Sequence, residues 1–312
     1  MNILDGVTEI ENLEYHARYD FSAVNIPNTV KIINNGAFMS NDLTSVIIPN
    51  SVEFIGISAF RFNKLNYVYF PPELAKLSAY AFAVNKLENI DIPKNVRVIE
   101  MGTFEYNILK YVNVPYGVIE IKEDAFYHNQ IIELVLPNSL TSIGDSAFKE
   151  NKINNLVLPN SLTSIGDSAF KENKINNLVL PNSLTSIGKR AFEKNELKEL
   201  ALSDGLRELD EYVFANNELL NVQISPSIKT IGKRAFTRNK INKLFLCEIV
   251  EKIGKGAFAR NNLEEVIIPE SVKSIDSFAF RDNPIKNIII KGDKYRFNQF
   301  WEEIGFPSEL KP

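Results

Sequence analysis

The chain has 312 residues, of which 45% are hydrophobic and 24% are charged, and its formal net charge is −4. This is an ordinary globular composition, and a slightly acidic balance without a long basic run argues against a nucleic-acid partner. The single cysteine, Cys247, excludes an intrachain disulfide and a cysteine-based zinc site, and no run approaches the roughly 18 apolar residues of a membrane span.

The first segment, residues 1–23, differs from everything that follows it. It has no basic stretch followed by an apolar core, so we expect no secretory signal here. The residues that follow, from 24 onward, repeat a 22-residue unit with a fixed Phe and a fixed Asn. One unit earlier, the position of the Phe holds His16 and that of the Asn holds Tyr19. We therefore predict a degenerate N-terminal cap over residues 1–23.

Residues 24–290 repeat one 22-residue unit without insertion or deletion. Phenylalanine recurs at positions 38, 60, 82, 104, 126, 148, 170, 192, 214, 236, 258 and 280. An asparagine follows each of them by three residues: Asn41, Asn63, Asn85, Asn107, Asn129, Asn151, Asn173, Asn195, Asn217, Asn239, Asn261 and Asn283. The unit that begins at Leu134 is repeated from Leu156 to Asn177 without a single change. Such a period indicates a solenoid, whose stacked units share one core.

Each unit contains one clear strand signal. In the first full copy the pattern L-x-x-V-x-I over residues 43–48 alternates in its last residues, and Pro49 ends it because proline cannot donate to a ladder. Strands of successive units are expected to pair in parallel. We interpret the Phe column as core, and each Asn as a structural residue whose amide satisfies backbone groups and bonds to the next coil.

The pattern N-x-L-x-x-V-x-I-P-x-S-V-x-x-I-G-x-x-A-F resembles the BspA-like leucine-rich repeats. It is written as NDLTSVIIPNSVEFIGISAF over 41–60 and NNLEEVIIPESVKSIDSFAF over 261–280. The resemblance implies a curved right-handed leucine-rich-repeat solenoid of twelve repeats, with a parallel sheet on the concave face and turns or short helical turns elsewhere. It also implies a bacterial surface or secreted protein that adheres to host matrix proteins or other cells. The family has no shared catalytic motif.

After residue 290 the period fails. The segment 291–312 places Phe297, Phe300, Trp301 and Ile304 at helical spacing, which predicts one apolar helix face over the open end of the last coil. The alternative is that this Trp-bearing helix docks a partner.

No constellation for catalysis is visible. The two histidines, His16 and His128, lie far apart in the sequence, and His128 occupies a repeat position that holds Glu, Arg or Asn in several other copies. The single glycines of the turns recur with the period and form no phosphate-binding loop. We predict that the chain is not an enzyme and holds no cofactor and no metal.

The strand positions that alternate with the core are the candidates for binding. The residues seven and nine after each Phe should face outward, and there Tyr67, Tyr69, Tyr111 and Phe245 stand out as the aromatic residues that binding surfaces favour. The alternative explanation is that aromatic residues simply favour strands.

Two functions are consistent with this pattern. The first is an interaction module that binds a protein or glycan partner through the concave sheet, outside the cell as the resemblance implies, although the sequence leaves a cytoplasmic location open. The second is a structural spacer or stalk within a larger surface protein, which the exact copy over 134–177 supports.

Overall fold

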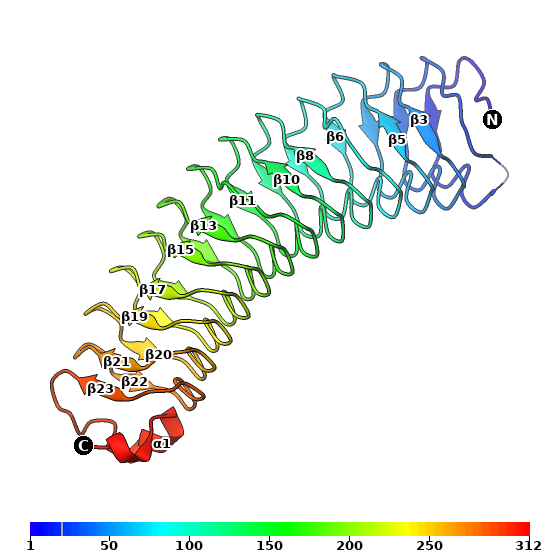
Figure 1. The fold of residues 1–312 in the computed structure, drawn as a ribbon. Coiled ribbons are helices and arrows are strands. Elements are labelled where there is room, and N and C mark those ends of the chain that lie inside the picture. The colour runs from blue at the N-terminus through cyan, green and yellow to red at the C-terminus, as the bar shows by residue number, and fades with distance from the viewer. Residues whose placement is uncertain (20) are drawn as a thin grey trace. The chain divides into compact units, whose positions relative to one another are not determined.

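The computed structural model describes residues 1–19 and 21–312, so Asp20 of the predicted N-terminal cap lies outside the described residues. The chain forms two compact units, Met1–Asn155 and Leu156–Pro312 (Figure 1). Each unit is a β-solenoid of parallel strands, which confirms the predicted fold. The two units together hold about 13 turns, close to the twelve copies counted in the sequence.

Each unit contains two kinds of strand, a longer and a shorter one. In the first unit the longer strands are β3 (Ser45–Ile47), β5 (Tyr67–Tyr69), β8 (Tyr111–Asn113) and β10 (Glu133–Val135). Its shorter strands are β1 (Glu9–Ile10), β2 (Ile32–Ile33), β4 (Phe54–Ile55), β6 (Lys76–Leu77), β7 (Val98–Ile99), β9 (Glu120–Ile121) and β11 (Ser142–Ile143).

The second unit repeats this arrangement. Its longer strands are β13 (Asn177–Val179), β15 (Glu199–Ala201), β17 (Asn221–Gln223), β19 (Lys243–Phe245), β21 (Glu265–Ile268) and β23 (Asn287–Ile290). Its shorter strands are β12 (Ser164–Ile165), β14 (Ser186–Ile187), β16 (Glu208–Leu209), β18 (Thr230–Ile231), β20 (Lys252–Ile253) and β22 (Ser274–Ile275).

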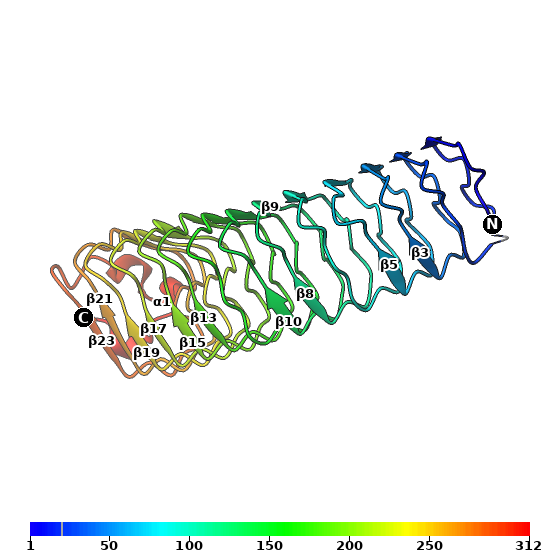
Figure 2. The same cartoon turned by 90° about the horizontal axis from the view of Figure 1, so that it is seen from above.

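The strands pair in parallel with a register that equals the sequence period. Ser45 lies opposite Tyr67 and Ile47 opposite Tyr69, and within each unit the strands of successive coils lie side by side (Figure 2). The short second strand of each coil is a feature that we did not predict. It spans only two residues, such as Ser142–Ile143, and so offers no alternation to read in the sequence.

The core of each unit is built around a stack of phenylalanine rings. In the first unit the rings follow one another from Phe38 to Phe148 with centroids 5.1–6.2 Å apart and nearly parallel planes. In the second unit the stack runs from Phe170 to Phe280. All these rings are fully buried, and each burial contributes roughly 1.5–3 kcal/mol to stability.

Two left-handed residues flank the Phe in every full repeat. Around Phe148 they are Ser146 and Glu150, with φ of 52° and 56°, and around Phe170 they are Ser168 and Glu172. A non-glycine residue in this region costs about 1–2 kcal/mol. The cost is offset because the backbone N–H groups of these residues donate hydrogen bonds to the following coil. For example, Ser168 N donates to Lys189 O at 2.8 Å.

The two ends of the chain supply rings that extend the stacks. At the N-terminus β1 pairs with β2, and the ring of Tyr15 stacks on Phe38 at 5.4 Å. At the other end Phe306 stacks on Phe280 at 5.2 Å, next to Trp301. Residues 1–23 thus contain a short coil of their own.

The C-terminal segment is helical in short pieces. They are η1 (Asn298–Phe300), α1 (Trp301–Ile304) and η2 (Ser308–Leu310). Phe297, Trp301 and Ile304 are buried as expected, but Phe300 is 49% exposed, so its predicted place on the apolar face is wrong. The reason is the change from 3₁₀ to α geometry at residue 301, which breaks the helical spacing that the prediction assumed.

Candidate binding surfaces

The asparagine column forms an internal network. The Asn63 side chain accepts a hydrogen bond from Leu43 N at 3.1 Å and donates to Phe38 O at 2.8 Å and to Phe60 O at 3.1 Å. We expected the amide to reach the next coil, but Leu43 and Phe38 belong to the preceding one. Because the amide is buried and fully engaged, this position holds the coils together and is not open to a ligand.

The outward positions of the longer strands form what we call the strand face. There Tyr67 is 53% exposed, Tyr69 40%, Tyr111 42% and Phe245 60%. Tyr67 and Tyr69 lie on the same strand, β5, whereas Tyr111 is two coils further along the first unit. Phe245 belongs to the second unit, on β19.

A hollow lies beside Tyr69. Its volume is about 550 Å³, within the range of ligand pockets, and Ser45, Ile47, Pro49 and Asn50 are among its lining residues. Ile47 lies opposite Tyr69 in the ladder and is 65% exposed. The strand face therefore begins with an aromatic and aliphatic pair at the edge of a concavity.

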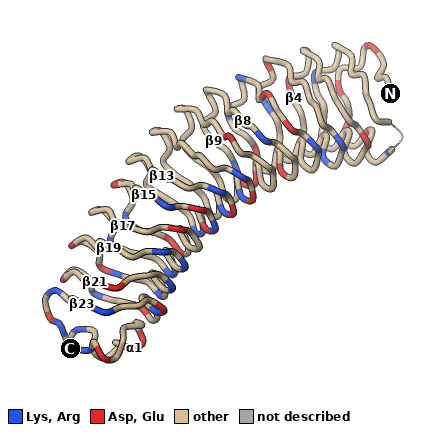
Figure 3. The backbone as a smooth tube through the Cα atoms, in the orientation of Figure 1, with Lys and Arg blue, Asp and Glu red and all other residues tan. Residues whose placement is uncertain are grey.

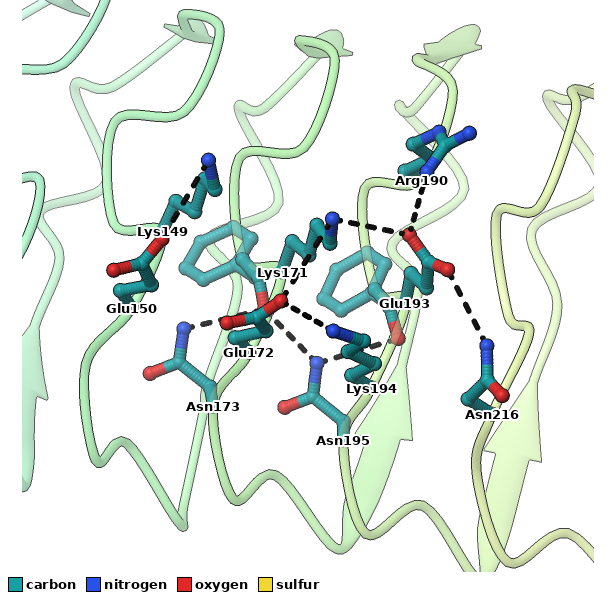
Figure 4. A network of polar contacts seen from close by, with 12 residues as sticks. Lys149, Glu150, Lys171, Glu172, Asn173, Arg190, Glu193, Lys194, Asn195 and Asn216 are labelled. Carbon is teal, nitrogen blue, oxygen red and sulfur yellow. Dashed lines mark hydrogen bonds and ion pairs between the residues drawn. The ribbon is translucent and has the colours of Figure 1, made fainter.

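Carboxylates and cations alternate on the turns next to the asparagine column. Glu193 lies 3.4 Å from both Lys171 and Arg190, and Glu172 lies 2.8 Å from Lys194 (Figure 4). Glu193 is buried and also accepts a hydrogen bond from Asn216 at 3.3 Å. These turn residues are therefore joined from coil to coil by side-chain contacts in addition to the backbone ladder.

A second hollow lies on the turns of the second unit, and we call it the turn-edge groove. Its volume is about 560 Å³, and six cations line it: Lys194, Arg234, Arg238, Lys255, Arg260 and Arg281. Two carboxylates, Glu193 and Asp282, also contribute. Lys and Arg recur from coil to coil in this unit (Figure 3). Sequence reasoning missed this groove, although basic residues just before and just after the Phe of the later copies were a signal.

His128 and Cys247 lie in different surroundings on the solenoid. His128 Nδ1 lies 2.9 Å from a Glu150 carboxylate oxygen, and its ring is 4.9 Å from Tyr106. Partial burial raises the pKa of Glu150, but hydrogen bonds from His128 and Tyr127 together with the nearby charge of Lys149 lower it, so the pKa lies below its usual value. Burial raises the pKa of the Cys247 thiol, which makes it a poor nucleophile.

Residues 1–19 and 21–312 contain neither a metal-ligand cluster nor a membrane-spanning helix. Within them no three His, Cys, Asp or Glu side chains are grouped so that they could hold a metal ion. The same ranges contain no helix with the length and apolar character needed to cross a bilayer.

Comparison with known proteins decides the family. The family model of the BspA type leucine rich repeat region matches residues 8–133, 119–242 and 189–302, and so nearly the whole chain. The chain belongs to the BspA-type leucine-rich repeat family. A comparison with curated proteins gives no significant match.

Solved structures share the fold of this BspA-type chain. A leucine-rich repeat protein from Bacteroides ovatus is 22% identical with a TM-score of 0.71, over 92% of this chain and 83% of that one. A leucine rich cell surface protein from Faecalibacterium prausnitzii is 24% identical with a TM-score of 0.52, over 97% and 87%. YopM from Yersinia enterocolitica is 21% identical with a TM-score of 0.56, over 86% and 57%. Proteins of the leucine-rich repeat class are commonly interaction modules and typically non-enzymatic.

Proposed function

We propose that this BspA-type chain is a non-enzymatic interaction module of a bacterial surface or secreted protein, which binds a protein or glycan partner through the strand face. The observation that carries the proposal is the exposure of Tyr67 and Tyr69 on one strand, beside a hollow of about 550 Å³. Large aromatic side chains that stay exposed on rigid strands give contact area at little entropic cost.

The chemistry of this face suits adhesion. Tyrosine offers an apolar ring and a hydroxyl, so it can pack on a partner and still hydrogen-bond at the rim. The proposed surface location is supported by the structural likeness to a protein named as a cell surface protein. Host extracellular matrix and other cells are the partners that this location would offer.

The test is a binding screen against extracellular-matrix proteins, glycans and whole cells. The variant Tyr67→Ala/Tyr69→Ala/Tyr111→Ala should lose the interaction and keep its melting temperature, because none of these rings is buried. The control is Tyr116→Ala/Tyr295→Ala, which removes two exposed tyrosines that lie outside the longer strands. Equal binding by both variants would contradict the proposal.

A spacer is the second candidate, and the exact repeat over 134–177 favours it. Duplicate coils add length without adding new surface chemistry. Deletion of residues 156–177 removes one whole period and separates the two functions. A spacer needs its length, so shortening should impair it, whereas binding through the tyrosines should persist.

A further inference from the structure

The turn-edge groove of the second unit carries a concentrated positive charge. Residues from consecutive coils, between Glu193 and Asp282, line it. Six of its side chains are cationic and two are anionic, although the whole chain has a net charge of −4. The charge of this groove is therefore opposite in sign to that of the chain as a whole.

The two carboxylates of the groove are already neutralised. Glu193 contacts two cations, and Asp282 lies 3.3 Å from Arg260 and 3.6 Å from Arg281. Among the residues that the structure describes, Arg234, Arg238 and Lys255 have no carboxylate within ion-pairing distance, although all three are exposed. The middle of the groove therefore presents cations that still lack an anionic partner.

The backbone of the groove is not available to a ligand. Arg234 N donates to Lys255 O at 2.9 Å, Arg238 N donates to Ala259 O at 3.0 Å, and Gly256 N donates to Ser277 O at 3.1 Å. These inter-coil bonds use the donors that a peptide strand would need for β-sheet addition. A ligand must therefore be held by the side chains.

The aromatic rings of the groove are in contact with cations. Arg190 lies 4.6 Å and Arg234 5.5 Å from the ring centre of Tyr212. Arg281 lies 5.1 Å and Lys255 5.6 Å from the ring centre of Phe278. These contacts hold the cations in place and occupy part of the ring faces on which nucleobases would stack or a protein anchor would pack.

We propose that the turn-edge groove binds an anionic polysaccharide through its sulfate or carboxylate groups. Guanidinium groups match such oxyanions with two parallel hydrogen bonds, and parallel coils repeat about every 4.8 Å, so a linear polyanion that crosses the coils meets a cation repeatedly. The groove of about 560 Å³ has the size of a ligand pocket, which suits a thin chain. This proposal uses other residues than the strand face and does not depend on it.

The experiment measures binding of heparin, as the sulfated polysaccharide, to the full chain at about 0.15 M ionic strength. Neutral dextran, single-stranded oligothymidylate and poly-glutamate are the comparison ligands. The groove variant is Arg234→Gln/Arg238→Gln/Lys255→Gln. The matched control is Lys198→Gln/Arg207→Gln/Lys243→Gln, which removes the same charge from exposed positions of the same unit that lie outside the groove and have no described carboxylate within ion-pairing distance.

The groove variant should raise the Kd for heparin at least about tenfold, because each lost charge-assisted hydrogen bond weakens binding by a comparable factor. The control should change the Kd less than about twofold. The salt dependence of binding should also become shallower in the groove variant alone, since fewer counterions are released. If the triple variant has a lowered melting temperature, Arg238→Gln alone is used, because Arg238 is exposed and its backbone bond to Ala259 O does not involve the side chain.

Four results would overturn the proposal. No heparin binding would refute it outright, and equal losses in both triple variants would show only diffuse charge attraction. Tighter binding of oligothymidylate would assign the groove to nucleic acid, and equally tight binding of poly-glutamate would assign it to acidic protein segments.

Discussion

Replacing Asn151 with alanine tests the asparagine network at one position. The Asn151 side chain accepts a hydrogen bond from Ile131 N at 3.0 Å and donates to Phe126 O at 2.9 Å and to Phe148 O at 3.1 Å. Phe126 O would keep a second donor, the amide of Asn129 at 3.2 Å. Ile131 N–H would be left buried without a partner, which costs about 1–3 kcal/mol. We therefore expect a loss of about 2 kcal/mol in the free energy of unfolding.

The measurement is urea unfolding together with hydrogen exchange at the Ile131 amide. Asn138→Ala is the matched control, since Asn138 is exposed and lies in the same unit. Exchange at Ile131 should accelerate in Asn151→Ala alone, because the acceptor of its N–H, Asn151 Oδ1, has gone. If Asn151→Ala lies within about 0.5 kcal/mol of the control and Ile131 exchanges no faster, the network does not bear the role assigned to it.

Two further changes test the turns. Val84 is a β-branched residue at a φ of 54°, a conformation that asparagine adopts at lower cost, so Val84→Asn should stabilise the chain by about 1 kcal/mol. The control Val157→Asn, at an exposed position without positive φ, should not stabilise it. Equal melting temperatures of the two variants would show that Val84 is not strained. Burial raises the pKa of Glu150, but hydrogen bonds from His128 and Tyr127 and the nearby charge of Lys149 bring it below its usual value. This carboxylate therefore stabilises the fold above the unfolded pKa, near 4.5, and loses that contribution as the pH falls through the folded value. Glu150→Gln should therefore lose part of the acid sensitivity of unfolding below about pH 4.5, and an unchanged pH profile would contradict this.

The parts of the fold that follow from the sequence are those in which one residue type repeats for one physical reason. A buried ring stack needs a large apolar side chain in every coil, so the Phe column could be predicted. Strand alternation could be predicted too, as on β5, where Val68 is buried and Tyr67 and Tyr69 face outward. In each case a side chain carries the structural role and is therefore visible in the sequence.

The turns could not be predicted because their conformation is set by the backbone. The position two residues before the Phe holds Ser146, Tyr80, Asp124 and Arg234 in different coils, yet all have φ between 52° and 60°. Glycine holds this position in three of the twelve copies, at Gly36, Gly102 and Gly256, but the other nine carry polar, charged or aromatic residues. Inter-coil hydrogen bonds impose the left-handed geometry, and they become apparent only when the coils are stacked.

The turn-edge groove was hidden for a different reason. Its cations come from four different coils with at most two in each, such as Arg234 and Arg238, so no local basic run appears. The net charge of the chain does not reveal these cations either, because the carboxylates of other surfaces outnumber them. A basic site on a solenoid has to be sought by comparing equivalent positions of different coils, since those positions are neighbours in space.

In this repeat protein the backbone contacts fix the fold, whereas the outward side chains supply the binding chemistry. The core, the asparagine column and the inter-coil hydrogen bonds fix each coil through residues that scarcely vary. The outward positions are then free to change, and Tyr80 and Arg234 can occupy the same backbone conformation in different coils. Two identical coils, such as those over 134–177, add length but no new chemistry. Selective binding must therefore arise where successive coils differ, as they do around Tyr67 and Tyr69 and along the turn-edge groove.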